Sequence, residues 1–314
     1  MRAVALALAL GATGCLFTIV TRSVAQLGEP TRRIPNRIAQ PVVDDARLAV
    51  LWVGHATVLV QMDDKIILTD PVFTSAVGQI SPRLVEPGID PANLPPRLDA
   101  VLVSHMHFDH LSVGSLALLA PRIARLFVPA GGLVYVPPDG YPAQELRWWE
   151  TWHDAEGLAI TAVPVRHVGG RYGIDRSWQT AAFTGYVIQY HGLTVYFGGD
   201  TAYDRERFAA ARERFPAIDL ALLPIAPIEP RDFMSRTHMD PAEALRALDD
   251  LGARWMVPIH FDTFINSYDH VGDAPRKLRE AMAARGIGDD RVVLLGQGEQ
   301  RIFIARGGSA HPIR

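Results

Sequence analysis

The feature that most constrains this chain is a short motif, H-x-H-x-D-H, at positions 105–110. An apolar run at 100–103 precedes the motif and a helix-like run at 112–119 follows it, which predicts a tight loop between a strand and a helix. Imidazole and carboxylate are ligands that zinc and similar divalent ions prefer. The spacing therefore predicts a metal site rather than an ordinary polar loop. Its ligand candidates are His105, His107, Asp109 and His110.

Three further ligand candidates follow other apolar runs that read as strands. The candidates are His167, Asp200 and His260, after runs at 158–163, 195–197 and 255–259. A site built along one rim of a sheet requires ligands at strand ends, because loops vary while the scaffold stays rigid. We therefore expect these residues to gather with the H-x-H-x-D-H motif at one place.

Composition describes a globular protein with a sizeable core. The chain has 314 residues, of which 48% are hydrophobic and 21% charged, enough for one large domain or two small ones. A net charge of -3 and a pI near 6.4 give no reason to expect nucleic-acid binding. Cys15 is the only cysteine, so a zinc site would be built from histidine and carboxylate.

The amino terminus has the pattern of a targeting segment. Arg2 precedes an uncharged run at 3–20, and small residues end at Ala25, which predicts a secretory signal cut before Gln26. The run is also at the lower limit of a membrane-spanning helix, so a retained anchor is an alternative. A lipidation site at Cys15 and a buried core helix are further alternatives. We expect an exported protein, periplasmic or anchored in the membrane and facing outward.

The remaining chain alternates strand-like and helix-like runs. Residues 71–98 are rich in proline and predict a long loop, and this length is usually functional. The expected segments are a signal peptide or anchor at 1–25, a linker or arm at 26–46, one hydrolase domain at 47–306 and a tail at 307–314. Strands are expected at 48–53, 57–62, 66–69, 100–103, 126–128, 158–163, 183–190, 193–197, 220–223, 255–259, 292–295 and 301–305, and helices at 112–119, 203–215, 241–251 and 274–284.

These motifs together resemble the metallo-β-lactamase fold superfamily. The resemblance runs from about Leu48 to about Ile304 and is greatest to the branch that contains N-acylphosphatidylethanolamine-hydrolysing phospholipase D. That branch also holds bacterial hydrolases of unknown substrate. The motifs shared with the branch include Trp52-Val53-Gly54-His55-Ala56-Thr57, Leu68-Thr69-Asp70-Pro71, Phe197-Gly198-Gly199-Asp200-Thr201, His238-Met239-Asp240-Pro241 and Ile259-His260-Phe261-Asp262-Thr263-Phe264.

The resemblance implies a four-layer αββα sandwich of the α/β (α+β) class and a site for two Zn²⁺, with iron or manganese as alternatives. His105, His107 and His167 would hold the first metal. Asp109, His110 and His260 would hold the second, and Asp200 would bridge both. Asp109 would also orient the metal-bridging hydroxide that attacks the substrate.

Four weaker candidates come from the same branch motifs. His238 would contact a phosphate oxygen or assist the leaving group, although a surface or capping role is the alternative. His55 and Asp70 would support the ligands from behind. Arg231 would pair with a phosphate, against the alternative of a solvent-facing arginine. The chain departs from the branch at Asp232 and at 169–180, which leaves its acyl-chain specificity open.

The resemblance implies a zinc-dependent hydrolase. A phosphodiesterase of phospholipase D type, acting on N-acylphosphatidylethanolamine-like lipids at a membrane surface, is the first expectation. A lactonase or a small-molecule phosphodiesterase is the alternative, and a β-lactamase proper fits the flanking motifs less well. A non-catalytic metal-binding protein would be expected to lack a ligand, and none is missing. The sequence does not determine the oligomeric state.

Overall fold

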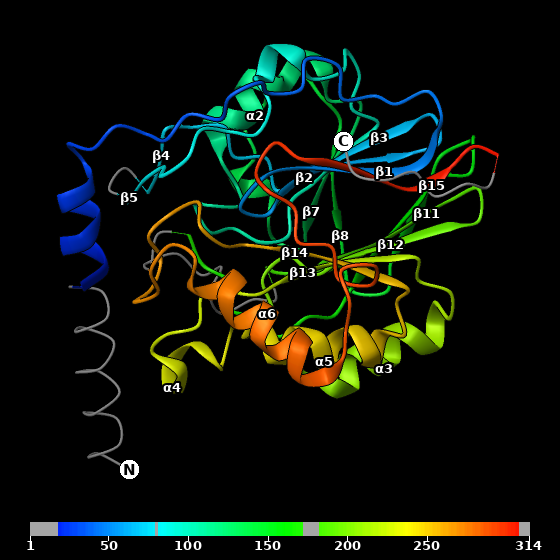
Figure 1. Ribbon diagram of the computed structural model, residues 1–314. Helices are drawn as coiled ribbons and strands as arrows, with labels where there is room; N and C mark the ends of the chain where they lie inside the picture. The colour runs from blue at the N-terminus through cyan, green and yellow to red at the C-terminus, as the bar shows by residue number, and fades with distance from the viewer. Residues whose placement is uncertain (1–17, 79–80, 172–181, 308–314) are drawn as a thin grey trace.

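Two β-sheets packed face to face form the centre of the protein, which a computed structural model describes at residues 18–78, 81–171 and 182–307 (Figure 1). The first sheet contains β1 (Ala46–Gly54), β2 (Thr57–Met62), β3 (Lys65–Thr69), β6 (Ala100–Leu102), β7 (Leu126–Pro129), β8 (Ala143–Leu146) and β15 (Gln300–Ala305). The second contains β9 (Thr151–His153), β10 (Ala159–Val163), β11 (Gly185–Tyr190), β12 (Leu193–Phe197), β13 (Leu220–Pro224) and β14 (Trp255–Ile259). The strand orders are β15-β1-β2-β3-β6-β7-β8 and β14-β13-β12-β11-β10-β9.

Helices cover the outer face of each sheet. Helix α2 (Val113–Leu119) packs on the first sheet, and Figure 1 shows the larger helices on the far side of the second. The larger helices are α3 (Arg205–Arg214), α5 (Pro241–Leu251) and α6 (Asp273–Arg285). This order of layers confirms the predicted four-layer αββα sandwich.

Alternation along the strands builds two apolar cores. In β1, Val50 and Trp52 belong to the core that continues between the sheets, whereas Leu51 and Val53 belong to the core beneath α2. Successive side chains of a strand point to opposite faces, so a strand covered on both faces must be apolar throughout. This explains why the sequence of β1 reads as a continuous hydrophobic run.

Strand direction decides where functional residues can meet. Strands β3 and β6 are parallel, and β1 runs the same way because both β1 and β3 are antiparallel to β2. In the second sheet β12, β13 and β14 are parallel, and β10 shares their direction through β11. The carboxyl ends of these strands therefore form one rim in each sheet.

Two expectations about secondary structure need correction, and two strands are additional. Residues 292–295 form a single bridge, Val292 to Met256, and not a strand, because Gly296 and Gly298 turn the chain toward β15 in the other sheet. Helix α3 begins at Arg205, not 203, because the side chain of Asp204 caps it. Strands β8 and β9 were not predicted, since both are short and mostly unburied and lack an apolar alternation.

The chain before β1 lies along the proline-rich loop. The backbone N–H of Arg32 donates to Leu84 O at 3.0 Å, and the N–H of Glu86 donates to Arg32 O at 3.0 Å. Residues 1–17 of the predicted signal peptide or anchor, with Cys15, and residues 308–314 of the predicted tail lie outside the described residues. Within the described part, no helix is long and apolar enough to cross a membrane.

Gly88 is the position where this loop meets the first sheet. A Cβ at Gly88 would lie 2.3 Å from the backbone nitrogen of Gly298 and 2.8 Å from Trp52 O. We predict that Gly88→Ala lowers the free energy of unfolding by about 1–3 kcal/mol, since backbone atoms must move to admit the methyl group. Urea denaturation measures this. Gly28→Ala is the control, because a Cβ there has open space around it; equal destabilisation by both variants would contradict the assignment.

Candidate metal centre

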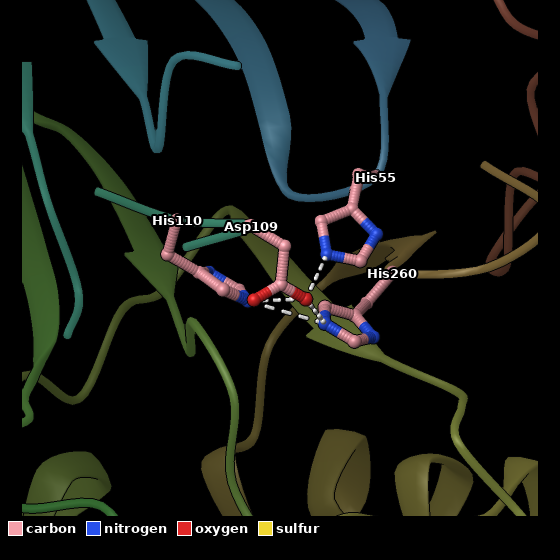
Figure 2. Close-up of side chains that lie close together, drawn as sticks. All are labelled: His55, Asp109, His110 and His260. Carbon is pink, nitrogen blue, oxygen red and sulfur yellow. Dashed lines mark hydrogen bonds and ion pairs between the residues drawn. The ribbon is translucent and has the colours of Figure 1, made fainter. Parts of the chain in front are cut away.

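The predicted ligands gather where the two rims face each other. Asp70 directly follows β3, His105 lies three residues beyond the end of β6, and His260 directly follows β14. Asp200 follows β12 after two glycines, and His167 lies four residues beyond β10. Figure 2 shows His55, Asp109, His110 and His260 pointing toward a common point from different segments.

Four overlapping groups of side chains have ligand atoms within 4.8 Å of one another. The groups are His105-His107-His167, His55-Asp109-His110-His260, His105-His110-Asp200 and His167-Asp200-His238. The last two groups contain Asp200 and share histidines with the first two. Asp200 therefore lies between the first two groups, at the position expected for a bridging residue.

Hydrogen bonds behind the rings aim the imidazole lone pairs at the centre. The Nδ1 atoms of His110, His167 and His260 lie 2.6, 2.9 and 3.0 Å from Asp70 Oδ2, Thr237 O and Ala226 O, respectively. An imidazole that donates from Nδ1 has its lone pair on Nε2, the atom that would bind a metal.

The centre has the contacts expected of a site for cations. His105 Nε2 lies 2.8 Å from His107 Nδ1, and His110 Nε2 lies 3.2 Å from His260 Nε2, so ring nitrogens face each other at close range. Asp200 Oδ1 is buried and, among the described residues, accepts no hydrogen bond, although His260 Nε2 lies 3.0 Å away. Lone pairs and a carboxylate oxygen that converge without donors fit divalent metal ions.

Burial and charge set the protonation states that such ions need. Burial lowers the pKa of His105, His107 and His167, which keeps these rings neutral near pH 7. Burial also opposes charge on His110, but the carboxylates of Asp200, Asp70 and Asp109 raise its pKa well above the ordinary value. Without metal, His110 is therefore the ring that takes up a proton. A bound metal ion would neutralise the same carboxylates in place of that proton.

Asp70 and His55 each contact one of the predicted ligands, His110 and Asp109, respectively. Asp70 is fully buried, is absent from the four groups, and accepts hydrogen bonds from Ser104 N and Oγ at 2.6 Å as well as contacting His110. His55 Nε2 lies 3.0 Å from Asp109 Oδ2. Because His55 also belongs to one ligand group, the geometry places it closer to the centre than a purely supporting role requires.

His238 and Arg231 differ in how they face the centre. His238 Nδ1 lies 3.6 Å from Asp200 Oδ2, and its side chain is 13% exposed, so it reaches both the buried centre and the surface. Arg231 pairs with Glu243 and Asp240 and donates from Nη2 to His238 O at 3.1 Å. Nε and Nη2 of Arg231 thus face carboxylates and hold the segment that carries His238, whereas Nη1 is buried and has no hydrogen-bond partner among the described residues.

Two residues that shape the motif loop were not predicted from the sequence. Arg171 is buried and donates from Nη1 to the carbonyls of Met106 and Leu111 at 3.0 and 2.8 Å. Ser104 Oγ lies 3.0 Å from His105 Nδ1 and joins that ring to Asp70. Ser104 adjoins the motif and was a discoverable candidate, whereas no local pattern marks Arg171.

Gly199 is required next to Asp200. Its φ is +56°, and a Cβ there would lie 2.4 Å from Ser104 Cβ. We predict that Gly199→Ala lowers bound metal per chain by at least about half, because the methyl group would push Asp200 away from the histidines. Metal analysis of the folded protein checks this. Gly192→Ala controls for backbone strain, since φ is +78° but the Cβ has open space; matched metal content in both variants would contradict the prediction.

Comparison with known proteins assigns the family. The model of the beta-lactamase superfamily domain matches residues 65–261. An uncharacterised protein of Mycobacterium tuberculosis is 35% identical over 79% of this chain and 68% of its own. N-acyl-phosphatidylethanolamine-hydrolyzing phospholipase D 1 of Caenorhabditis elegans is 31% identical over 90% of this chain and 86% of its own.

A solved structure shows the same fold. Igni18, a metallo hydrolase from Ignicoccus hospitalis, superposes with a TM-score of 0.59 at 22% identity and covers 81% of this chain and 97% of its own. The matched family model, the two relatives and the fold agree with the resemblance seen in the motifs. The chain therefore belongs to the metallo-β-lactamase superfamily and is a metal-dependent hydrolase.

Proposed function

We propose that this protein is a phosphodiesterase of phospholipase D type that acts on N-acylphosphatidylethanolamine-like lipids. The observation that carries the proposal is that Asp200 lies between two ligand groups, 4.0 Å from His167 Nε2 of one and 3.0 Å from His260 Nε2 of the other, because two adjacent cations suit displacement at phosphorus. The name of the Caenorhabditis elegans relative supports the lipid as the first substrate to test.

Seven residues would hold two Zn²⁺. His105, His107 and His167 would bind one ion, Asp109, His110 and His260 the other, and Asp200 both. When bound, such ions lower the pKa of a water molecule and neutralise charge on phosphate oxygens. Iron and manganese accept the same ligand types, so the identity of the metal is itself part of the proposal.

Asp109 is the group of the chain best placed to orient the attacking water. Its side chain is 21% exposed, so a substrate can reach it, and His55 fixes Oδ2 at 3.0 Å. The carboxylate stays ionised because the neighbouring His110, His55 and His260 together overcome the effect of burial and hold its pKa well below the ordinary value. An ionised, fixed carboxylate can accept a hydrogen bond from the water that attacks phosphorus.

His238 is the group best placed on the side of the leaving oxygen. Burial lowers its pKa to about 4, so the ring is neutral at pH 7 and has one N–H to donate. From the rim of the centre this N–H would donate a hydrogen bond to a phosphate oxygen or to the departing oxygen. The hydrogen bond from Arg231 to the His238 carbonyl keeps the ring in place.

A membrane surface is the proposed place of work. The apolar run at 3–20 supports export or anchoring. Exposed apolar side chains adjoin segments of the centre, and they support contact with lipid. They are Val168, Phe233 and Val271, with exposed fractions of 48%, 42% and 64%.

The substrate proposal is tested with the full chain loaded with zinc. N-acylphosphatidylethanolamine in mixed micelles is expected to yield phosphatidic acid and an N-acylethanolamine, detected by mass spectrometry. His107→Ala should abolish both products because it removes a proposed ligand. Zinc binding without lipid turnover would contradict the lipid assignment and direct the search to lactones and small phosphodiesters.

The role of His238 predicts a selective loss of rate. His238→Ala should lower kcat by about 10²-fold, the lower end of the usual loss when a hydrogen-bond donor to developing charge is removed, while zinc content stays unchanged. The exposed His153 on β9 offers the matched control, His153→Ala, which should keep full rate. Equal rates for the two variants would remove His238 from the mechanism.

A further inference from the structure

A cavity of about 350 Å³ adjoins the His55 and His260 side of the metal centre. One wall is the loop that follows β14, residues 261–271. Another wall comes from the other end of the chain, where residues 18–26 are helical and contribute Arg22 and Gln26. Figure 1 shows this segment, in blue, beside the loop, in orange.

Arg22 fastens the two walls together. Its Nη1 donates to Ser267 O at 2.7 Å and its Nη2 donates to Asp269 O at 2.8 Å. Hydrogen bonds from a charged donor are among the stronger ones, and a guanidinium that binds two carbonyls fixes their relative position. Ser23, the next residue, is fully buried.

The loop that Arg22 holds is also connected to the proposed catalytic side. The Asp269 carboxylate accepts hydrogen bonds from the backbone N–H groups of Ile228 and Glu229 at 2.7 and 3.1 Å. Those residues lead into the segment that carries His238. A change at Arg22 therefore acts on a loop that contacts both sides of the centre.

These contacts bear on the fate of the amino terminus. A cut before Gln26, as the leader pattern predicts, would remove Arg22 and Ser23 and take away part of the cavity wall. Buried and hydrogen-bonded residues on the leader side of the cut are unexpected for a segment that is discarded.

We propose that residues 18–26 are retained in the working enzyme and that Arg22 is a positioning residue, which shapes the cavity for one ester arm of the substrate. Gln26 and Asn266 offer amide groups, whereas Leu84, Phe264 and Ile265 are apolar. This lining suits an arm with both a hydrogen-bonding group and an alkyl part. The ligand class rests on the proposed function; the retention and the role of Arg22 rest on the contacts alone.

Retention is tested on the chain as cells make it. The full-length gene product is purified from whole cells and its amino terminus is determined by intact mass and terminal sequencing. A terminus before Arg22 is expected. A mature chain that begins at Gln26 would overturn the proposal.

The positioning role is tested by Arg22→Ala in the full, zinc-loaded chain. Backbone amide hydrogen exchange in residues 261–271 should become about tenfold faster or more. In the variant this loop can open without first breaking the two hydrogen bonds from Arg22. Arg22→Lys should recover part of the protection, since an ammonium can still donate to the carbonyls. Arg33→Ala removes an exposed arginine eleven residues further along the amino-terminal chain and should leave exchange unchanged.

Kinetics separate this proposal from the proposed function. With a hydrolysed lipid, Arg22→Ala should raise KM by about tenfold and leave kcat within about twofold, as expected for lost binding outside the reacting centre. If no lipid is hydrolysed, the hydrogen-exchange result still decides the role of Arg22. Unchanged exchange in residues 261–271 would overturn that role whatever the substrate.

Discussion

The rest of the centre depends on how the buried carboxylate of Asp200 is compensated by the groups around it. This carboxylate lies between the His105 and His260 sides, and burial makes its charge costly unless cations or donors compensate it. The histidines around it present lone pairs, so a metal ion is the compensation that fits. The close approach of Gly199 to Ser104 brings this carboxylate to the other sheet. The site is thus a consequence of how the two sheets face each other.

Much of the centre was predictable because its residues follow apolar strands. A strand end is visible in a sequence, and parallel strands bring their ends to one rim, so His105, Asp200 and His260 could be expected together. The four-layer order came from resemblance to a family, since periodicity alone indicates only mixed α and β structure. The prediction of a strand at 292–295 was wrong. An apolar run does not reveal whether its backbone pairs with a neighbouring strand at several residues or, as here, at a single one.

Contacts between distant parts of the chain were beyond sequence reasoning. Arg171 holds the motif loop by its carbonyls, and Arg22 holds a loop that lies 245 residues away in the sequence. Hydrogen bonds to backbone carbonyls leave no pattern of residue types. The contact between His55 and Asp109 likewise depends on how the loops after β1 and β6 meet at the edge of the first sheet. The sequence therefore indicated the ligand types of the centre, but not the cavity beside it or the amino-terminal segment that forms part of its wall.

The most direct test of this account is anomalous diffraction at the zinc edge from crystals of the full, zinc-loaded chain. Two peaks are expected, one bounded by His105, His107 and His167 and the other by Asp109, His110 and His260, with Asp200 between them. The map would also show whether His55 binds the second ion or only its carboxylate ligand. A single peak, or peaks away from Asp200, would contradict the two-metal centre and with it the proposed hydrolysis at phosphorus.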